Sequence, residues 1–237
     1  MGSLMQTETT RSEDFQRIGV ELRDLLNLEN PPIAISFIDS PPEGLKKNSE
    51  VAPSGCVFWI RAFKDSFYTV PEDHFNCNIG TVTHGFKKPS ELDLASCVDI
   101  NLMVGAEYIP PEALDMIPKM NERPKYVAYG PLDSATFEPD VVLLVCNPQQ
   151  AMLIAEAAGS YKTLGLPTCS AIPNAYNTNE VSISFGCVTN RVRTGIKPSE
   201  LVVTIPKAQL GEFVKRLKPR VEANNKVAQA VTAMLHS

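Results

Sequence analysis

The chain has 237 residues, 43% of them hydrophobic and 21% charged, and its 22 basic and 27 acidic side chains give a formal net charge of −5. This length suits one large or two small domains, and the apolar fraction is that of a soluble globular protein. The mildly acidic balance lacks the basic surface that nucleic acids and anionic membranes attract. The longest apolar runs, Val141 to Cys146 and Ala151 to Ala155, fall far short of the roughly 20 residues that span a bilayer. Residues 1–15 lack the basic and apolar regions of a secretory signal, so we expect a soluble, cytoplasmic protein.

The amino-terminal part of the chain is predicted to form a helix and a strand. Apolar residues at helical spacing begin at Phe15, and Ser12 is the candidate N-cap in front of them. The β-branched run Ile33–Ile38 predicts a strand, and the proline-rich stretch after it predicts a surface loop that leads to Cys56. The less regular sequence that follows is expected to hold three short elements: a helix at 57–63, an extended piece at 67–70, and a helix or compact turn region at 73–86.

The second half of the chain alternates between strand and helix patterns. The runs KYVAYGPL and DVVLLVC predict two strands, the second buried on both faces because its residues do not alternate in polarity. Asn147-Pro148 predicts the start of a helix, with Asn as N-cap and Pro at the first helical position. The remaining expected elements are a helix started by Pro111, strands at 181–185 and 201–206, a helix that stops near Pro219, and a last helix from Val221 to Leu235.

Strands and helices are mixed through the whole length, without an internal repeat or a linker. We therefore expect a single α/β domain at residues 12–237, with a mixed β-sheet covered by helices. An α+β arrangement is the alternative fold class, and a separate small lobe at residues 50–120 is the alternative domain organisation.

The six cysteines do not form a CxxC pair, so a zinc ribbon and a thioredoxin-like motif are both excluded. Cys146 ends an apolar strand and Cys97 lies in an amphipathic stretch, so both fit the role of small buried hydrophobic residues. The other four have glycine, proline or asparagine beside them, which indicates irregular backbone at the ends of elements. A ligand or a metal can reach a thiol in such a place: Cys56, Cys77, Cys169 and Cys187.

The junction between the buried strand and the helix that starts at Pro148 is a candidate anion site. Free N–H groups and the positive end of the helix dipole would meet there, next to Asn147 and Gln150. The alternative is plain capping, in which Asn147 serves only its own helix.

The turn after Gly186 is a second candidate site because it carries Cys187, Arg191 and Arg193. Arginines beside a cysteine lower the pKa of its thiol, which then acts as a nucleophile or a metal ligand. Arginine also binds a carboxylate or a phosphate through two hydrogen bonds. The alternative is a pair of solvated arginines on a loop.

His74, Cys77 and His84 supply a third group of nitrogen and sulfur donors, but their spacing is not that of a zinc site. The motifs GxSxG, GxGxxG and GxxxxGK[ST] are absent, which argues against a serine hydrolase and against dinucleotide or P-loop nucleotide binding.

Four segments, in this order, carry a family resemblance: GCVFWIRAFKDSFYTV, NCNIG, VCNPQQAMLIAEAAGSYKTLG and TCSAIPNAYNTNEVSISFGCVTNRVRTGIKPSELVVTIP. Over residues 15–217 the chain resembles the domain-of-unknown-function 169 family, uncharacterised proteins of archaea and mostly anaerobic bacteria. The resemblance places the family's recurrent residues on Cys56, Cys77, Cys169 and Cys187, on Asn147-Pro148 and on Arg191. Where this chain has Cys77-Asn78-Ile79-Gly80 the family often has Cys-Pro-Gly, so the backbone there is expected to differ.

Four cysteine thiolates are the usual ligands of a [4Fe–4S] cluster, so we expect Cys56, Cys77, Cys169 and Cys187 to hold one. Against this, cluster motifs usually group at least two cysteines within a few residues. The expected activity is redox or lyase chemistry on a small anionic metabolite, with Arg191 and Cys187 as the catalytic residues and Arg191 as the anchor of the anion. Asn147, Gln150 and Arg191 are the expected ligand- or cofactor-binding residues.

Two alternatives stay open from the sequence. One is a non-catalytic binding module for a small anionic ligand or cofactor, in which the cysteines are structural. The other is a metal-free enzyme in which Cys187 is the nucleophile, activated by Arg191 or Arg193. A homo-oligomer is compatible with each, and neither nucleic acid nor a membrane is expected as a partner.

Overall fold

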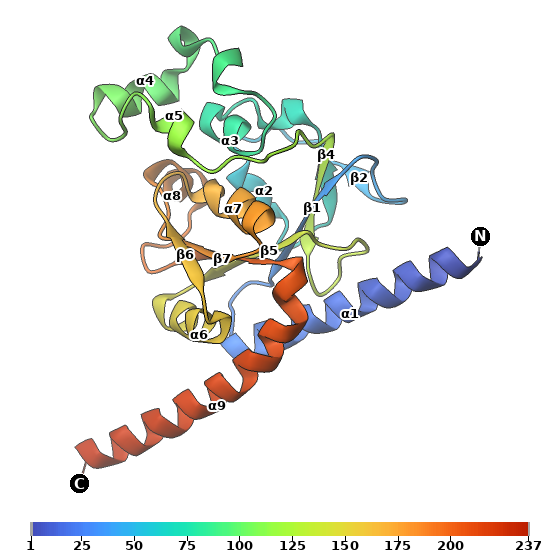
Figure 1. Ribbon diagram of the computed structural model, residues 1–237, viewed down its shortest axis with the longest axis vertical. Coiled ribbons are helices and arrows are strands. Elements are labelled where there is room, and N and C mark those ends of the chain that lie inside the picture. The colour runs from blue at the N-terminus through green and yellow to red at the C-terminus, as the bar shows by residue number, and fades with distance from the viewer. Residues whose placement is uncertain (1, 237) are drawn as a thin grey trace.

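The structure is a computed structural model that describes the backbone of residues 2–236 and the side chains of residues 14–236. Its centre is an eight-stranded mixed sheet with helices on both faces (Figure 1). The strands are β1 (Ile33–Ile38), β2 (Lys46–Lys47), β3 (Phe67–Thr69), β4 (Tyr126–Pro131), β5 (Val141–Cys146), β6 (Tyr161–Leu164), β7 (Val181–Ser184) and β8 (Leu201–Pro206). Their order across the sheet is β2-β3-β4-β1-β5-β8-β7-β6.

The inner strands of the sheet are antiparallel, and the parallel pairs β2–β3 and β6–β7 lie at its two edges. β5 lies between β1 and β8, and its register with β8 runs from Val141 opposite Pro206 to Cys146 opposite Leu201. Every residue of β5 is buried, which confirms the strand predicted from its non-alternating apolar run.

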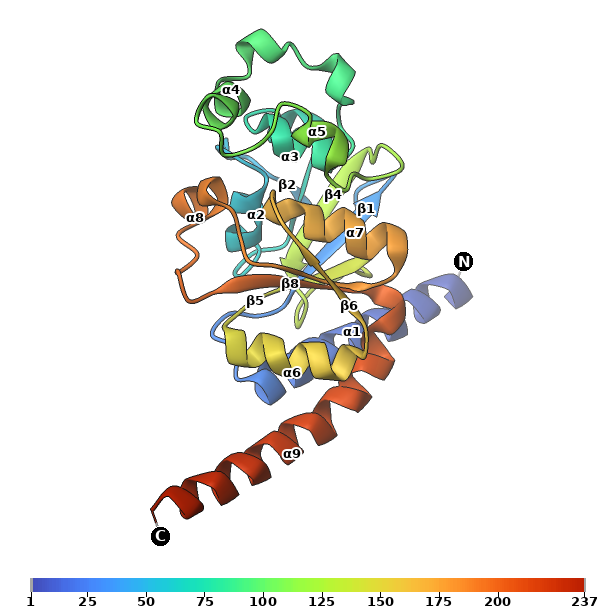
Figure 2. The same cartoon turned by 60° about the vertical axis from the view of Figure 1, so that its left-hand side comes forward.

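The helices form two layers on the sheet and a third group beyond one of them (Figure 2). They are α1 (Gly2–Leu26), α2 (Cys56–Arg61), α3 (Asn78–Thr83), α4 (Val98–Gly105), α5 (Ala113–Met116), α6 (Pro148–Ala158), α7 (Ala171–Thr178), α8 (Val188–Thr194) and α9 (Leu210–Leu235). α1, α6 and α9 cover one face, whereas α2, α7 and α8 cover the other. None of the helices within residues 2–236 is long and apolar enough to cross a membrane.

Each layer has its own apolar core. Leu22 of α1, Ile154 of α6 and Phe213 of α9 pack on one face of the sheet. Phe58 and Trp59 of α2 belong to the core on the opposite face. These two cores, one on each side of a mixed sheet, confirm the predicted α/β fold.

Helices α3, α4 and α5 share a separate, smaller apolar cluster that includes Ile79, Ile100 and Leu114. This cluster lies within the range where the sequence allows a small lobe. The division of the chain into domains stays a prediction.

Two predicted helix boundaries are wrong. α1 begins at Gly2 and passes through Ser12, because residues 3–11 contain neither glycine nor proline to stop the helix. α9 continues through Pro219 as one helix to Leu235. Proline removes the hydrogen bond to the carbonyl of Lys215, but Lys215 is exposed, so water can hydrate the freed carbonyl.

Candidate functional site

Four cysteines from distant parts of the chain line one cavity of about 40 Å³. They are the four that the sequence singled out by their turn contexts: Cys56, Cys77, Cys169 and Cys187. A cavity of this size holds an ion or a few water molecules. The other two cysteines lie outside it, Cys97 in the small cluster of α3–α5 and Cys146 in the core on the far face of the sheet.

The fold brings the four thiols together because each cysteine lies where a short helix begins. Cys56 is the first residue of α2, and Cys77 and Cys187 are the N-caps of α3 and α8. Cys169 lies in the 3₁₀ turn directly before α7. Since α2, α7 and α8 lie on the same face of the sheet and α3 lies against them, their starting turns meet around one space (Figures 1 and 2).

Polar groups already contact three of the sulfur atoms. The Cys77 Sγ accepts a hydrogen bond from the Gly80 N–H at 3.4 Å, and the Cys187 Sγ accepts one from the Asn190 N–H at 3.4 Å. The Cys56 Sγ lies 3.2 Å from the Ser54 hydroxyl oxygen. Backbone N–H groups that donate to sulfur are the outer contacts that orient and tune metal-ligating thiolates.

Burial makes three of the thiols hard to ionise. It raises the pKa of Cys77 to about 11 and that of Cys169 well above the ordinary value, and it also raises the pKa of Cys56. The negative charge that Cys77, Cys56 and Cys187 carry when ionised raises the pKa of Cys169 further. The four sulfurs are thus near enough to repel one another as thiolates, which a bound cation would relieve.

Cys187 differs from the other three because its pKa is lowered. Burial alone would raise the pKa, but Thr168, the Thr189 hydroxyl and the Asn190 N–H together more than offset that effect. The Thr189 hydroxyl oxygen lies 3.3 Å from the sulfur. Cys187 is therefore the thiol of this cavity that ionises most easily.

The wall of the cavity carries polar groups without partners. Asn190 is 1% exposed, and neither atom of its side-chain amide makes a hydrogen bond within the described residues. The Thr168 hydroxyl also lacks a partner at hydrogen-bond geometry there, although it lies close enough to Cys187 to lower the pKa of that thiol. The Asn190 amide still lies close enough to Cys56 to oppose the rise in its pKa. Tyr129, which does not line the cavity, also has a buried hydroxyl without a partner in the described chain. Burial raises the pKa of this hydroxyl, and the charges of ionised Cys169 and Cys56 raise it further. Buried polar groups are nearly always paired, so this wall is suited to a polar or charged occupant.

His74 and His84 lie next to the cavity but do not line it. Both are fully buried, their ring centroids are 5.3 Å apart, and a Cβ at Gly55 would come within 2.9 Å of the His74 Nδ1. The His74 Nε2 is 2.9 Å from the Thr69 hydroxyl oxygen, and the His84 Nδ1 is 2.8 Å from the Gly80 carbonyl oxygen. Among the side chains of residues 14–236, no three or more His, Cys, Asp or Glu stand at the spacing that holds a metal ion. A metal in the cavity would therefore require the thiols to turn towards its centre.

Asn147 and Gln150 lie on the opposite face of the sheet, at the start of α6. Their side chains cap each other's backbone N–H groups at 2.9 and 2.7 Å. The Gln150 amide also donates to the carbonyls of Leu26 and Asn27, which ties α6 to the end of α1. The structure does not bring these two residues to the cysteines, and ligand binding by them stays a prediction.

Arg191 holds a loop, and the neighbouring Arg193 faces the cavity. The Arg191 guanidinium donates to the carbonyls of Phe185 at 2.6 Å, Lys197 at 2.5 Å and Glu200 at 2.9 Å. Arg193, two residues further along α8, is among the residues that line the cysteine cavity. An anchoring role for Arg191 stays a prediction. The conformation of this loop decides which of the two arginines lies near the thiols. The sequence has no pattern that would predict it.

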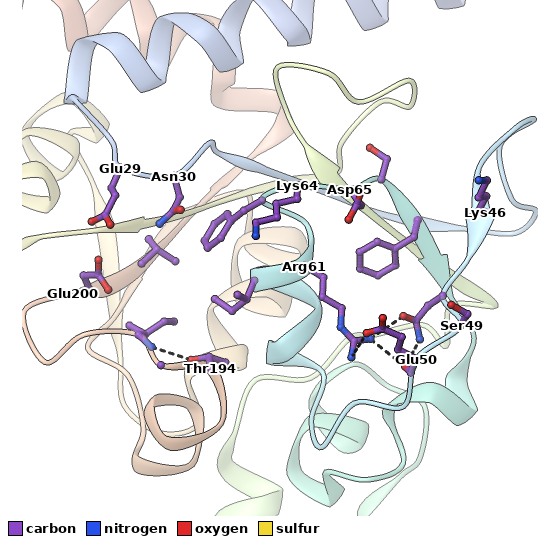
Figure 3. A pocket seen from close by; sticks show the side chains of 18 of the residues that line it. Glu29, Asn30, Lys46, Ser49, Glu50, Arg61, Lys64, Asp65, Thr194 and Glu200 are labelled. Carbon is purple, nitrogen blue, oxygen red and sulfur yellow. Dashed lines mark hydrogen bonds and ion pairs between the residues drawn. The ribbon is translucent and has the colours of Figure 1, made fainter.

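A second, open cleft of about 710 Å³ lies at the other ends of α2 and α8 (Figure 3). Most of its charges pair with each other: Arg61 with Glu50 at 3.1 Å, and Lys197 with Glu29 and Glu200 at 2.5 and 3.6 Å. None of the cysteines or histidines of the described chain lines it. We therefore take the smaller cysteine cavity as the candidate functional site.

Fold and site together define an α/β protein with a buried cavity lined by four cysteines. The chain belongs to the domain-of-unknown-function 169 family, described as "Uncharacterised ArCR", whose sequence pattern matches residues 21–216. It is also similar to the uncharacterized protein MJ0308 of Methanocaldococcus jannaschii, with 24% identity over 213 residues that cover 84% of this chain and 91% of that protein. No solved structure matches the chain. The predicted family is thus confirmed, and these comparisons name no activity.

Proposed function

We propose that Cys56, Cys77, Cys169 and Cys187 ligate a metal centre, most simply a [4Fe–4S] cluster. We propose further that the protein carries out redox or lyase chemistry on a small anionic metabolite. The observation that carries the proposal is that four thiols from distant segments line one cavity, while the two remaining cysteines lie elsewhere. Four cysteine thiolates are the usual ligand set of such a cluster.

The groups around the cavity are of the kinds that stabilise metal-bound thiolates. The Gly80 and Asn190 N–H groups already point at sulfur atoms, and positive charge between the thiols would offset the burial and the mutual repulsion that raise the pKa of Cys169. The volume of about 40 Å³ is that of an ion, so a whole cluster requires the walls to separate. The outer wall comes from α3–α5, which pack through their own small apolar cluster, and this is the part we expect to shift.

A cluster held by all four cysteines would pass electrons to the substrate, and one held by three of them would leave an iron open to polarise the substrate as a Lewis acid. The chain's own contribution is to exclude water and orient the reacting groups. The unpartnered Asn190 amide and Thr168 hydroxyl would hydrogen-bond to the substrate or to the sulfurs, because both are buried and face the cavity.

Two observations support competing functions. The raised pKa values keep Cys56, Cys77 and Cys169 protonated at neutral pH, as expected of a non-catalytic module in which thiols only pack. The lowered pKa of Cys187 instead suits a metal-free catalytic nucleophile.

Elemental analysis and an absorption spectrum of protein purified under anaerobic conditions separate these functions. The proposal expects a brown protein with broad visible absorbance and about four iron and four sulfide per chain. A folded protein that stays colourless and free of iron, even after incubation with ferrous iron, sulfide and a thiol reductant, would overturn it.

A further inference from the structure

An open groove of about 730 Å³ lies between α4 and α8, directly beside the cysteine cavity. The two spaces share five lining residues: Asp99, Met103, Tyr108, Thr189 and Arg193. The volume is within the range of small-molecule binding sites. A ligand in the groove would therefore have one end at the wall that the groove shares with the thiols.

The sides of the groove are apolar and exposed. Val98 and Leu102 of α4 are 77% and 71% exposed, and Val192 of α8 is 80% exposed. Single exposed apolar residues are common, but several that face one groove indicate a surface that a ligand or partner covers. These side chains suit a hydrocarbon chain.

Arg193 is a charged group without a partner where the groove meets the cavity. It is half-buried, and no residue of the described chain forms a hydrogen bond or an ion pair with it. Arg193 lines both the groove and the cysteine cavity, so its side chain lies where the two spaces meet. The planar fork of a guanidinium matches a carboxylate or a phosphate, which it binds through two hydrogen bonds.

The lining of the groove offers one positive charge to an anion. Arg193 is its one cationic lining residue and Asp99 its one anionic residue, so a phosphate dianion would meet too little positive charge. The Oδ1 of Asp99 accepts hydrogen bonds from the Asn78 amide at 2.9 Å and the Ile100 N–H at 3.0 Å, whereas its buried Oδ2 has no partner within the described residues. These contacts stabilise Asp99 without using Arg193, so the arginine stays available.

We propose that this groove binds a monocarboxylate with an apolar chain. Arg193 holds the carboxylate beside the thiols, and Val98, Leu102 and Val192 contact the chain. The inference rests on the proposed function for the reaction that would follow, but carboxylate binding itself needs no metal.

Isothermal titration calorimetry of the full chain with hexanoate, hexanamide and acetate tests the proposal. Hexanoate should bind about tenfold more tightly than hexanamide, which lacks the charge, and more than tenfold more tightly than acetate, which lacks the chain. Arg193→Gln should remove the preference for hexanoate over hexanamide. Leu102→Asp should remove the preference over acetate. Arg220→Gln and Val227→Asp, matched changes on the exposed part of α9, should alter neither preference.

Arg193→Lys provides a second variant that keeps the charge and loses the planar fork, and it should bind hexanoate with intermediate affinity. Equal binding of hexanoate and hexanamide by the wild type, or an unchanged preference in Arg193→Gln, would overturn the proposal. Sedimentation would also overturn the proposal if it showed a dimer that Leu102→Asp dissociates, because a second copy of the chain would then cover the groove.

Iron content is measured in the same samples. If the wild type binds hexanoate but contains no iron, the proposed function is wrong and this inference stands. If the protein contains iron but does not bind hexanoate, this inference is wrong and the proposed function stands.

Discussion

Cys77 and Cys187 occupy similar positions, each capping a short helix with its Sγ, yet their thiols ionise differently. Cys77 accepts one N–H hydrogen bond, and burial raises its pKa to about 11. Cys187 also has Thr168 and Thr189 beside it, and its pKa is lowered. Thr168, through its side chain and its backbone, and the Thr189 hydroxyl thus make Cys187 the more reactive thiol, because a thiolate needs hydrogen-bond donors to offset its burial.

This difference predicts the order of alkylation in metal-free, reduced protein. With iodoacetamide at neutral pH, Cys187 should react before the other three cavity thiols, as followed by peptide mass spectrometry. Its rate should level off at a lower pH than that of Cys77, whose pKa is about 11. Labelling of Cys77 or Cys169 ahead of Cys187 would contradict the assignment.

His74 and His84 are buried without charge, since burial lowers the pKa of both. In the unfolded chain each binds a proton below a pH of about 6.5 that the folded chain does not bind. Their contribution to stability is therefore present above that pH and is lost as the pH falls below it.

Acid should thus lower the free energy of unfolding by up to about 2.7 kcal/mol per pH unit while both histidines differ in protonation between the two states. His84→Gln should roughly halve that slope, whereas His236→Gln, at an exposed position, should leave it unchanged. Urea unfolding at a series of pH values measures the slope. An equal slope in wild type and His84→Gln would show that this histidine does not contribute.

Elements with a strong local sequence pattern could be predicted, whereas elements with a weak pattern could not. β5 and α6 follow from an unbroken apolar run and from the Asn147-Pro148 start, both confirmed. β6 (Tyr161–Leu164) has no apolar pattern, because it is a mostly exposed edge strand that exists through its pairing with β7. The short helices around the cavity are likewise held by tertiary packing more than by their own sequence.

Because α1 lies close to the turn after β4, replacing one glycine of α1 by alanine should destabilise the protein. A Cβ at Gly19 would lie 2.7 Å from the Asp133 backbone nitrogen, too close for any real contact. Gly19→Ala should therefore destabilise the protein by about 1–3 kcal/mol, although alanine normally favours a helix. Gly211→Ala, where nothing lies within 4 Å, should be neutral or slightly stabilising. Chemical denaturation compares the two, and equal effects would mean that α1 packs less closely than described.

At the scale of the whole molecule, the site is a product of topology. The four cysteines were predicted from glycine, proline and asparagine beside them, which mark the ends of elements. That Cys56, Cys169 and Cys187 share one face of the sheet depends on the strand order, which no local pattern encodes. For the same reason the position of Arg193 at the cavity, and of Asn147 and Gln150 on the far face, came only from the structure.

The central claim is that these four thiols, and not the other two, ligate one metal centre. Its most direct test is the iron content of six single Cys→Ser variants prepared anaerobically beside the wild type. Cys56→Ser, Cys77→Ser, Cys169→Ser and Cys187→Ser should each hold less iron than the wild type, while Cys97→Ser and Cys146→Ser, whose sulfurs lie outside the cavity, should match it. An iron-free wild type, or iron that stays at the wild-type level in any of the four cavity variants, would contradict the claim.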